Sequence, residues 1–413
     1  MSRRLALAIG VAFAAVLVGV AVGVLPPPPP TPSPSSVASA RSPALSSANP
    51  SPSPVGPGVL SSVHTTPLGL IGGSWIFLGK RIPRPERNRV EVQIVARSLA
   101  GGPWVIAIAF DVAGVGIPEG IYDTTPYLRR QFSPDGRRMV FSIEAHLVVF
   151  DLVSGEAIPL GVAGYFPSWS KDGSQIAFLF QKPVADVVPP PNAIWVIPAG
   201  GGIPREIAVV GSQRHSAEWS PDGSQLVLAQ EGDVTVVETA TGRITTRVAA
   251  ISSTTALFAH WRAASPELAI ATSGCESRAQ IVVLTTADAA PRTLVEAGEG
   301  CGPLELRDPR WNRAATDELL YILARGEAGH EFNDYQTHLL NVATGKDTRL
   351  PFAAYEATWS WDGTQIVYLA KDPGAPFANV AMVWNRNGSG ELEVLRAFGF
   401  YEESFFSVAS LDY

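Results

Sequence analysis

Cysteine, histidine and charged side chains are scarce in this chain of 413 residues. It contains two cysteines and six histidines, and Asp, Glu, Lys and Arg together make up 17% of it. A structural zinc centre needs about four cysteine or histidine ligands at defined spacings, which so few scattered residues do not supply. We therefore expect no metal site and no cofactor.

The motifs of common catalytic sites are also absent. No Gly-x-Ser-x-Gly segment occurs, so the nucleophile elbow of serine hydrolases is missing. His330 and Glu331 begin like a zinc-protease motif, but Asp334 stands where the second histidine is required. The sequence therefore predicts a non-catalytic protein.

Positive charge is in deficit, with 31 basic and 38 acidic residues and a net charge of −7. Three of the arginines and none of the acidic residues precede residue 67, so the remainder of the chain carries about −10. Such a balance disfavours nucleic acid and anionic lipid as partners. Proteins, peptides, glycans and cations remain possible partners.

One long hydrophobic run is present, from Leu5 to Leu25, and it holds 21 uncharged residues. As a helix it would span about 31 Å, close to the roughly 30 Å hydrocarbon core of a bilayer. Two arginines precede it and the next basic residue is Arg41, which predicts a cytoplasmic N-terminus and an exported remainder. We predict that residues 1–25 are a single-pass anchor in the cell membrane. The alternative is a secreted protein cleaved after residues 38–40, although that site lies well beyond the apolar run.

Residues 26–66 are rich in proline, serine and alanine and open with five consecutive prolines. At about 3.1 Å per residue, a polyproline spacer of this length would reach up to roughly 130 Å. A disordered tether without a length requirement is the alternative. The expected organisation is therefore an anchor over residues 1–25, a linker over 26–66 and one folded domain over 67–413.

Beyond residue 120, an aromatic residue followed by a polar turn and a hydrophobic run recurs six times, at intervals of 37 to 50 residues. The aromatics are Phe132, Trp169, Trp219, Trp261, Trp311 and Trp359. Four of them precede an Asp-Gly turn, which favours a hairpin, whereas the units of Trp261 and Trp311 have lost it. A period of about 40 to 50 residues is typical of a propeller blade. The sequence therefore predicts an all-β fold, a β-propeller of four-stranded antiparallel blades.

The two ends of the folded domain predict how the ring closes. Residues 73–79, 90–98 and 104–110 resemble the second, third and fourth strands of a blade whose first strand is missing. Residues 402–411, beyond the last complete unit, form an alternating stretch that could supply that strand. Strands from both termini would then close seven blades. Six blades with an unrelated N-terminal hairpin is the alternative.

The SPDG and WSxDG units resemble the WD40-like repeats of TolB-type propellers over about residues 120–395. This resemblance implies the propeller fold. It does not imply one particular function, because such propellers serve as periplasmic interaction scaffolds, as accessory domains of peptidases and as sensor ectodomains. We assign the turn aspartates to turn formation and the tryptophans to packing between blades.

Cys275 and Cys301 fall in loops that alternating strand direction places on one face of the same blade. Export supplies an oxidising compartment, so we predict a disulfide between them. It would close a loop of about 25 residues, worth roughly 3 kcal/mol.

Candidate ligand-binding residues come from aligning the units on their aromatic. The position four residues earlier holds Leu128, Tyr165, His215, Leu257, Arg307 and Tyr355. First strands line the channel of a propeller, so we predict that Tyr165, His215, Arg307 and Tyr355 bind a peptide tail or a small anionic ligand at one channel mouth. The alternative is that they are ordinary residues at the starts of strands.

These observations predict a membrane-tethered extracytoplasmic propeller that acts as a scaffold for a protein or peptide partner, or as a ligand-binding domain, at the cell envelope. The alternative is a propeller enzyme, a lyase or glycan hydrolase that uses residues at the channel mouth.

Overall fold

The computed structural model describes most of the domain beyond the linker. The described residues are 63–68, 74–84, 89–99, 101–113, 128–182, 191–211, 217–230, 233–246, 255–263, 265–273, 279–285, 291–298, 304–326, 332–360, 362–372, 375–388, 391–396 and 404–412. Residues 1–62, His215 and both cysteines lie outside them, and so do the predicted anchor and the predicted disulfide. Within the described ranges, no helix is long and apolar enough to cross a membrane.

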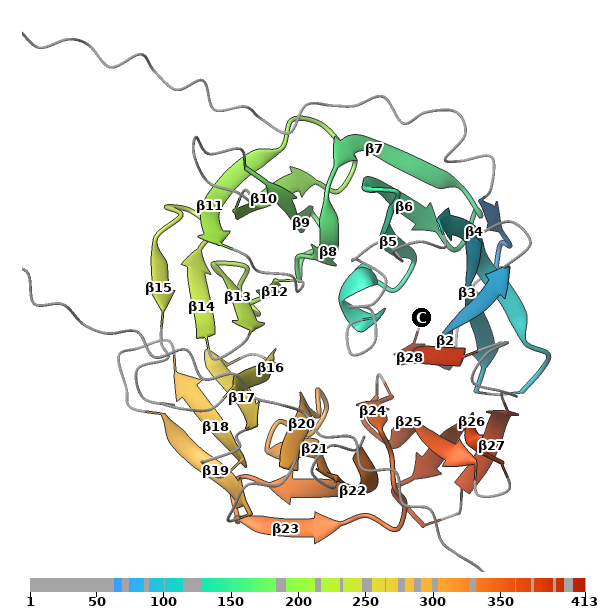
Figure 1. Ribbon diagram of the computed structural model, residues 1–413, viewed down its shortest axis with the longest axis vertical. Coiled ribbons are helices and arrows are strands. Elements are labelled where there is room, and N and C mark those ends of the chain that lie inside the picture. Colours follow the sequence, from blue (N-terminus) through green and yellow to red (C-terminus); the bar gives the residue numbers. More distant parts are fainter. Residues whose placement is uncertain are drawn as a thin grey trace, which may run out of the picture. The chain divides into compact units, whose positions relative to one another are not determined.

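Seven antiparallel blades stand in a ring around a central axis (Figure 1), and a bridge between β17 (Glu267–Ser273) and β20 (Leu304–Trp311) joins two of them into one eight-stranded sheet. We number the blades from the N-terminal side. Blade 1 contains β1 (His64–Thr65), β2 (Ser74–Arg84), β3 (Arg89–Ser98), β4 (Val105–Ala113) and β28 (Ser404–Asp412). The small strand β1, within the last residues assigned to the linker, adds to the outer edge by pairing with β4.

Blades 2 to 4 follow along the chain. Blade 2 has β5 (Arg138–Ile143), β6 (His146–Asp151) and β7 (Ala157–Ala163), preceded by the 3-10 helix η2 (Leu128–Gln131). Blade 3 has β8 (Tyr165–Trp169), β9 (Gln175–Gln181), β10 (Asn192–Pro198) and β11 (Arg205–Gly211). Blade 4 has β12 (Glu218–Trp219), β13 (Gln225–Gln230), β14 (Asp233–Glu238) and β15 (Ile244–Thr246). In blade 2 the first strand is reduced to a single bridge from Phe132 to Met139.

Blades 5 to 7 complete the ring. Blade 5 has β16 (Thr255–Trp261), β17 (Glu267–Ser273), β18 (Ala279–Thr285) and β19 (Arg292–Ala297). Blade 6 has β20 (Leu304–Trp311), β21 (Glu318–Gly326), β22 (Phe332–Asn341) and β23 (Lys346–Arg349). Blade 7 has β24 (Glu356–Trp359), β25 (Gln365–Asp372), β26 (Ala375–Asn385) and β27 (Glu391–Arg396). The units of Trp261 and Trp311 therefore form complete blades without an Asp-Gly turn.

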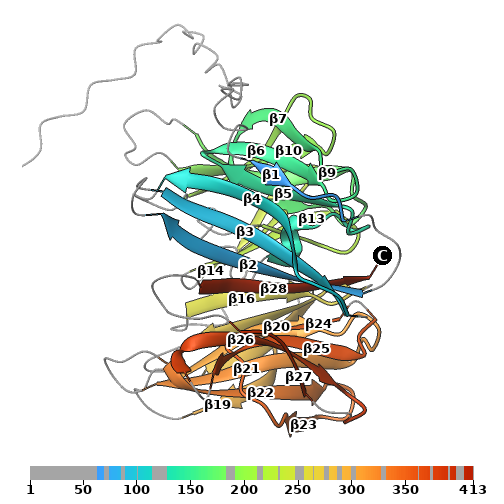
Figure 2. The ribbon, with the colours of Figure 1, turned by 90° about the vertical axis from the view of Figure 1, so that its right-hand side faces the viewer.

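The C-terminal strand β28 closes the ring, as predicted. It pairs antiparallel with β2, from Ser74 opposite Asp412 to Arg81 opposite Ser404, and lies beside β2 in the side view (Figure 2). Because β28 takes the innermost place in the sheet that also holds β2, β3 and β4, the prediction of seven blades is confirmed and the six-blade alternative is wrong.

The Asp-Gly turns are held by their own side chains. In blade 4, Ser220 donates to Asp222 at 2.6 Å, and the backbone N–H of Ser224 donates to the same carboxylate at 3.0 Å. Gly223 has a φ of +72°, which only glycine adopts without strain. The turns with Asp172 and Asp362 repeat these bonds. The aspartates thus form the turns, and all four turns lie on one end of the ring, which we call the turn face.

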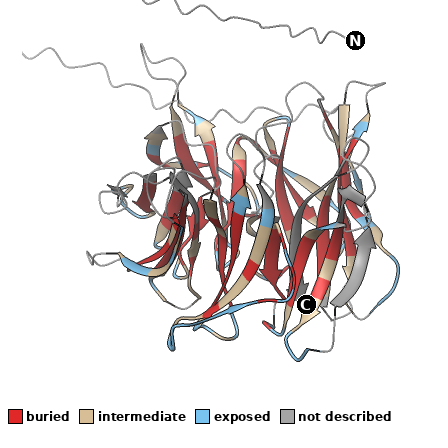
Figure 3. Cartoon of the chain, turned by 60° about the horizontal axis from the view of Figure 1, so that its bottom comes forward, coloured by how far each residue is buried: buried red, intermediate tan, exposed pale blue. Residues whose placement is uncertain are grey.

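The blade tryptophans pack between neighbouring sheets. Trp169, Trp219, Trp261, Trp311 and Trp359 are all buried. The indole of Trp219 also donates to the carbonyl of Ser168 in the preceding blade at 3.2 Å, and that of Trp359 to the carbonyl of Arg310 at 3.0 Å. Buried residues concentrate in the strands, between the blades (Figure 3). The tryptophan positions therefore fix where each first strand ends relative to its neighbour.

Candidate functional site

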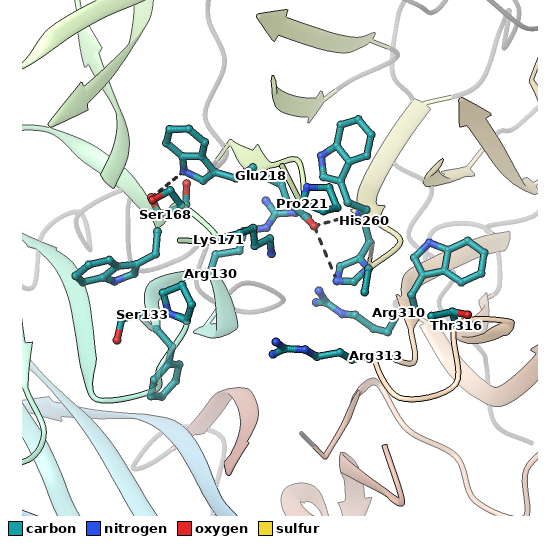
Figure 4. A pocket seen from close by; sticks show the side chains of 18 residues that line it. Arg130, Ser133, Ser168, Lys171, Glu218, Pro221, His260, Arg310, Arg313 and Thr316 are labelled. Atoms are coloured by element: carbon teal, nitrogen blue, oxygen red, sulfur yellow. Dashed lines mark hydrogen bonds and ion pairs between the residues drawn. The ribbon is translucent and has the colours of Figure 1, made fainter. Parts of the chain in front are cut away.

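A cavity of about 530 Å³ opens at the turn face, where the first strands end. Blades 2 to 6 each contribute the end of the first strand and the turn that follows it. Its volume is within the usual range for small-molecule pockets, roughly 300–1,000 Å³. We call it the turn-face pocket; Figure 4 shows its side chains.

Cationic side chains dominate the lining of this pocket. They are Arg130, Lys171, Arg310 and Arg313, whereas Glu218 is the one carboxylate among the described lining residues. His260 completes the titratable set. The pocket therefore has a net positive charge in a chain whose overall charge is −7. Since low-dielectric walls strengthen the local field, an anion is the ligand that it favours.

Glu218 lines the pocket and is only 3% exposed. Its Oε2 is 2.6 Å from Nη2 of Arg130, and its Oε1 accepts a hydrogen bond from the backbone N–H of Trp261 at 3.2 Å. Nε2 of His260 is 3.9 Å from the same Oε1. Burial alone would raise the pKa of Glu218, but the charges of His260, Arg130 and Lys171 outweigh it and lower the pKa to about 2. Glu218 is therefore an anion at every physiological pH.

Arg130 connects three blades across the channel end. It belongs to η2 at the start of blade 2, yet its Nη2 donates both to Glu218 of blade 4 and to the carbonyl of Ala259 of blade 5, the latter at 3.1 Å. The side chain is only 11% exposed. In Figure 4 a dashed line joins the Glu218 carboxylate to the ring of His260, so Glu218 contacts charged or titratable groups from both blade 2 and blade 5.

A second buried ion pair lies in blade 6. Oδ1 of Asp308 is 2.6 Å from Nη2 of Arg310, and both side chains are 7% exposed. Asp308 has a φ of +52°, and the register of β20 shifts between Arg307 and Arg310. Burial raises the pKa of Asp308 because desolvation outweighs the attraction of the nearby arginines. Its Oδ2 is buried and accepts no hydrogen bond within the described part of the chain.

The residues predicted from sequence to bind a ligand lie elsewhere. Tyr165 begins β8 and pairs with Leu179, while Arg307, within β20, forms an ion pair with Glu305. Tyr355 directly precedes β24. None of these three lines the turn-face pocket, because a strand rises about 3.3 Å per residue and they stand four residues before the aromatic. Their role in ligand binding stays a prediction, as does that of His215, which lies outside the described residues.

Tyr355 has a buried polar atom without a described partner. Its hydroxyl is buried and has no hydrogen-bond partner among the described residues, and its ring lies 6.5 Å from that of Tyr335. Burial, followed by the charge of Glu356, raises the pKa of Tyr355 well above its ordinary value. The phenol is therefore neutral, and a hydrogen-bond acceptor would satisfy it.

The residues of the turn-face pocket follow a pattern that the sequence does contain. The residue directly before the aromatic of each unit is, in order, Gln131, Ser168, Glu218, His260, Arg310 and Thr358. Four of these six line the pocket. An alignment of the units read at this position, instead of three residues earlier, would have pointed to Glu218, His260 and Arg310.

No family model matches this chain, and no curated protein does. Solved structures do. The periplasmic gluconolactonase of Pseudomonas aeruginosa matches with a TM-score of 0.50 and 14% identity, over 80% of this chain and 99% of that one. An oligogalacturonate lyase from Vibrio parahaemolyticus has a TM-score of 0.48 and 13% identity over 65% and 77% of the two chains. TolB from Acinetobacter baumannii has 0.42 and 12% over 81% and 83%.

The likeness is one of fold. At 14% identity, the likeness to the gluconolactonase shows a shared fold alone and leaves the function to be argued from the site. Across the described residues, no group of three or more His, Cys, Asp or Glu side chains is placed to hold a metal ion.

Proposed function

We propose that this protein is an extracytoplasmic binding propeller that holds an anionic ligand in the turn-face pocket. The observation that carries the proposal is the charge of the lining, four cationic side chains against one carboxylate, in a chain of net charge −7. A carboxylate or phosphate group would gain charge-assisted hydrogen bonds there, which are stronger than neutral ones.

The protonation state of Glu218 supports binding over acid-base catalysis. With a pKa of about 2, Glu218 holds no proton to donate at neutral pH and is a weak base. Both of its oxygens already accept hydrogen bonds, from Arg130 and from the backbone of Trp261. These contacts fit a structural role in which Glu218 holds the Arg130 side chain in place.

Tryptophan fluorescence of the full chain in detergent tests the proposal, because Trp219, Trp261 and Trp311 line the pocket. Succinate and inorganic phosphate are titrated at constant ionic strength. We expect saturable binding that Arg313→Gln weakens about fivefold, since a hydrogen bond to a charged group contributes about 1.5 kcal/mol or more before solvent screening. Arg349→Gln, which removes an exposed charge from β23, is the matched control and should bind like the unaltered chain.

The outcomes separate clearly. No saturable binding of either anion to the unaltered chain would overturn the proposal. Equal losses in Arg313→Gln and Arg349→Gln would show that net charge, and not the pocket, attracts the anion.

A lyase or glycan hydrolase is the second candidate. The observation that favours it is Asp308, a buried carboxyl group whose pKa is raised and which lies beside Arg310 of the pocket lining. A carboxyl group of raised pKa is a candidate proton donor. Uronate oligosaccharides and sugar lactones are suitable test substrates, since the pocket would favour their carboxylate in substrate or product. Turnover that Asp308→Asn abolishes would establish the enzyme; turnover unchanged in that variant would exclude this residue.

For the cellular setting we propose a membrane tether over residues 1–25 and a protein or peptide partner at the envelope. The hydrophobic run and the two preceding arginines support the tether. Alkaline carbonate washing of cell membranes is the test. Retention in the membrane fraction is expected, whereas release of the intact protein would contradict the anchor.

A further inference from the structure

The peptide bond between Asp308 and Pro309 lies in a strained bulge of blade 6. Among the described residues, a positive φ at a non-glycine residue occurs at Glu144 and Ala145, which form the turn between β5 and β6, and at Phe166 and Asp308. The last two directly precede a proline. A residue before proline favours extended backbone with a φ of about −120°, so the φ of +52° at Asp308 costs energy that the surrounding packing must impose.

The strand ladder does not hold this bond. The register between β20 and β21 shifts between Arg307 and Arg310. As a result, Asp308 and Pro309 together stand opposite one residue of β21. Proline has no backbone N–H and donates no hydrogen bond to the sheet. The bond therefore lies outside the regular pairing, although both of its residues are buried.

The side chain of Asp308 is held in place with one oxygen unused. Its Oδ1 is 2.6 Å from Nη2 of Arg310, and the side chain is 7% exposed. Its Oδ2 is buried and accepts no hydrogen bond within the described part of the chain. Arg310, Arg130 and Arg307 act on this carboxyl group as cations, but burial outweighs them and raises its pKa. A reacting group that is already held loses little further freedom when it attacks a neighbouring atom.

We propose that the chain cleaves its own peptide bond between Asp308 and Pro309. Oδ2 of Asp308 attacks the carbonyl carbon of the same residue, the new C–O bond closes a cyclic anhydride, and the C–N bond to Pro309 breaks. The proton of the carboxyl group passes to the leaving nitrogen, which becomes the secondary amine of Pro309. Water then opens the anhydride, so the balance is the hydrolysis of one peptide bond. Arg310 lines the turn-face pocket, which gives that water a route to the bond.

Cleavage would leave the ring closed. Residues 309–413 contain the remainder of blade 6, blade 7 and β28, and β28 pairs with β2 in the other fragment. The new amino terminus at Pro309 directly precedes Arg310 of the pocket lining. Processing at this bond therefore changes the charge of one pocket wall without releasing either fragment. It requires no pocket ligand, so it is independent of the proposed function.

The chain contains its own control for this reaction. Asp372 and Pro373 form the other Asp-Pro bond in the sequence. The purified full chain is incubated in detergent at mildly acidic pH, either folded or in urea, and the products are identified by intact mass. From the folded chain we expect fragments 1–308 and 309–413, formed about tenfold faster than those from the bond at Asp372. In urea the two bonds should be cut at similar rates, because the fold no longer holds Asp308.

Two variants test the route. Asp308→Asn keeps the shape of the side chain but removes the carboxyl group, and Pro309→Ala replaces the tertiary amide by an ordinary one. Each should slow cleavage at this bond about tenfold or more, whereas cleavage at Asp372 stays unchanged. Thermal unfolding verifies that the variants fold. If one does not, the comparison of the folded with the urea-unfolded unaltered chain still decides.

The results that contradict self-cleavage are distinct. A chain that stays intact would overturn the proposal, and so would equal cutting of the two Asp-Pro bonds in the folded chain. Cleavage at an unchanged rate in folded Asp308→Asn would show that solvent acid or a protease cuts the bond, and the carboxyl group of Asp308 would then have no part in it.

Discussion

Removing Arg130 should destabilise the propeller although η2 is only four residues long. The side chain holds Glu218, which is 3% exposed and lies two blades away, so Arg130→Met leaves a buried carboxylate with a weaker set of partners. The pKa of Glu218 falls from 4.5 to about 2 in the fold, which corresponds to about 3 kcal/mol at 1.4 kcal/mol per unit. His260 and Lys171 share in lowering it, so we expect Arg130→Met to cost about 1–3 kcal/mol of unfolding free energy.

The pH dependence gives a second readout with a defined sign. Because the pKa of Glu218 is depressed in the fold, its contribution is present in full above about pH 4.5 and is lost as the pH falls towards about 2. Arg130→Met should flatten this acid limb of the stability curve. The double variant Arg130→Met with Glu218→Gln should recover part of the loss at neutral pH, since it no longer buries an unpartnered charge.

Urea unfolding followed by tryptophan fluorescence measures these differences. Arg349→Met, in the exposed strand β23, is the matched control and should change the unfolding free energy by less than about 0.5 kcal/mol. The reasoning is refuted if Arg130→Met equals this control at pH 7 and keeps the same loss of stability between pH 4.5 and 2.

Three further predictions concern the ring and its closure. Trp219→Phe should lower the unfolding free energy by about 1–3 kcal/mol, because the indole N–H no longer bonds the carbonyl of Ser168; urea titration measures it, and an unchanged midpoint would contradict the role of that bond. Ending the chain before residue 404 removes β28 and exposes the edge of β2, so we expect aggregation or loss of the cooperative transition in calorimetry; a monomer with unchanged melting would show that closure is dispensable. Thiol titration of the denatured, unreduced exported protein should find no free thiol if Cys275 and Cys301 form a disulfide, and two free thiols would disprove it.

Much of the fold could be predicted because local signals agreed with the ring. The Asp-Gly turns mark hairpins through their own hydrogen bonds, and each aromatic marks the end of a first strand. The units of Trp261 and Trp311 lack the Asp-Gly turn but keep the hydrophobic strand that follows the aromatic, so the repeat can still be recognised in them. Closure by residues 404–412 was predictable because the N-terminal blade lacked a first strand and the C-terminal stretch was a strand beyond the last complete unit.

The residues of the pocket were harder to predict from the sequence. Arg130 reaches Glu218 across 88 positions of sequence, from a 3-10 turn with no strand pattern to align. The channel residues selected from sequence stand four positions before the aromatic, whereas the cavity lies at the other end of the same strands. An alignment of repeats identifies equivalent positions but does not say which end of the channel is hollow. That depends on which side chains fill the space between five blades.

Backbone irregularities interrupt the first strands of blades 3 and 6. Phe166 and Asp308 both stand three residues before their tryptophan, and both have a positive φ, +53° and +52°. The register of β8 and β20 shifts at these points. A non-glycine residue in this region costs about 1 kcal/mol or more and persists only where packing imposes it. A bulge re-aims the side chains beyond it, so Lys171 and Arg313 leave their strands after a distortion that the structure places in blades 3 and 6. The first strand of blade 5 also shifts register, between Ala256 and Phe258, so a bulge at this point is shared by three of the blades that form the pocket. Among the described residues, a positive φ three residues before the tryptophan occurs in blades 3 and 6.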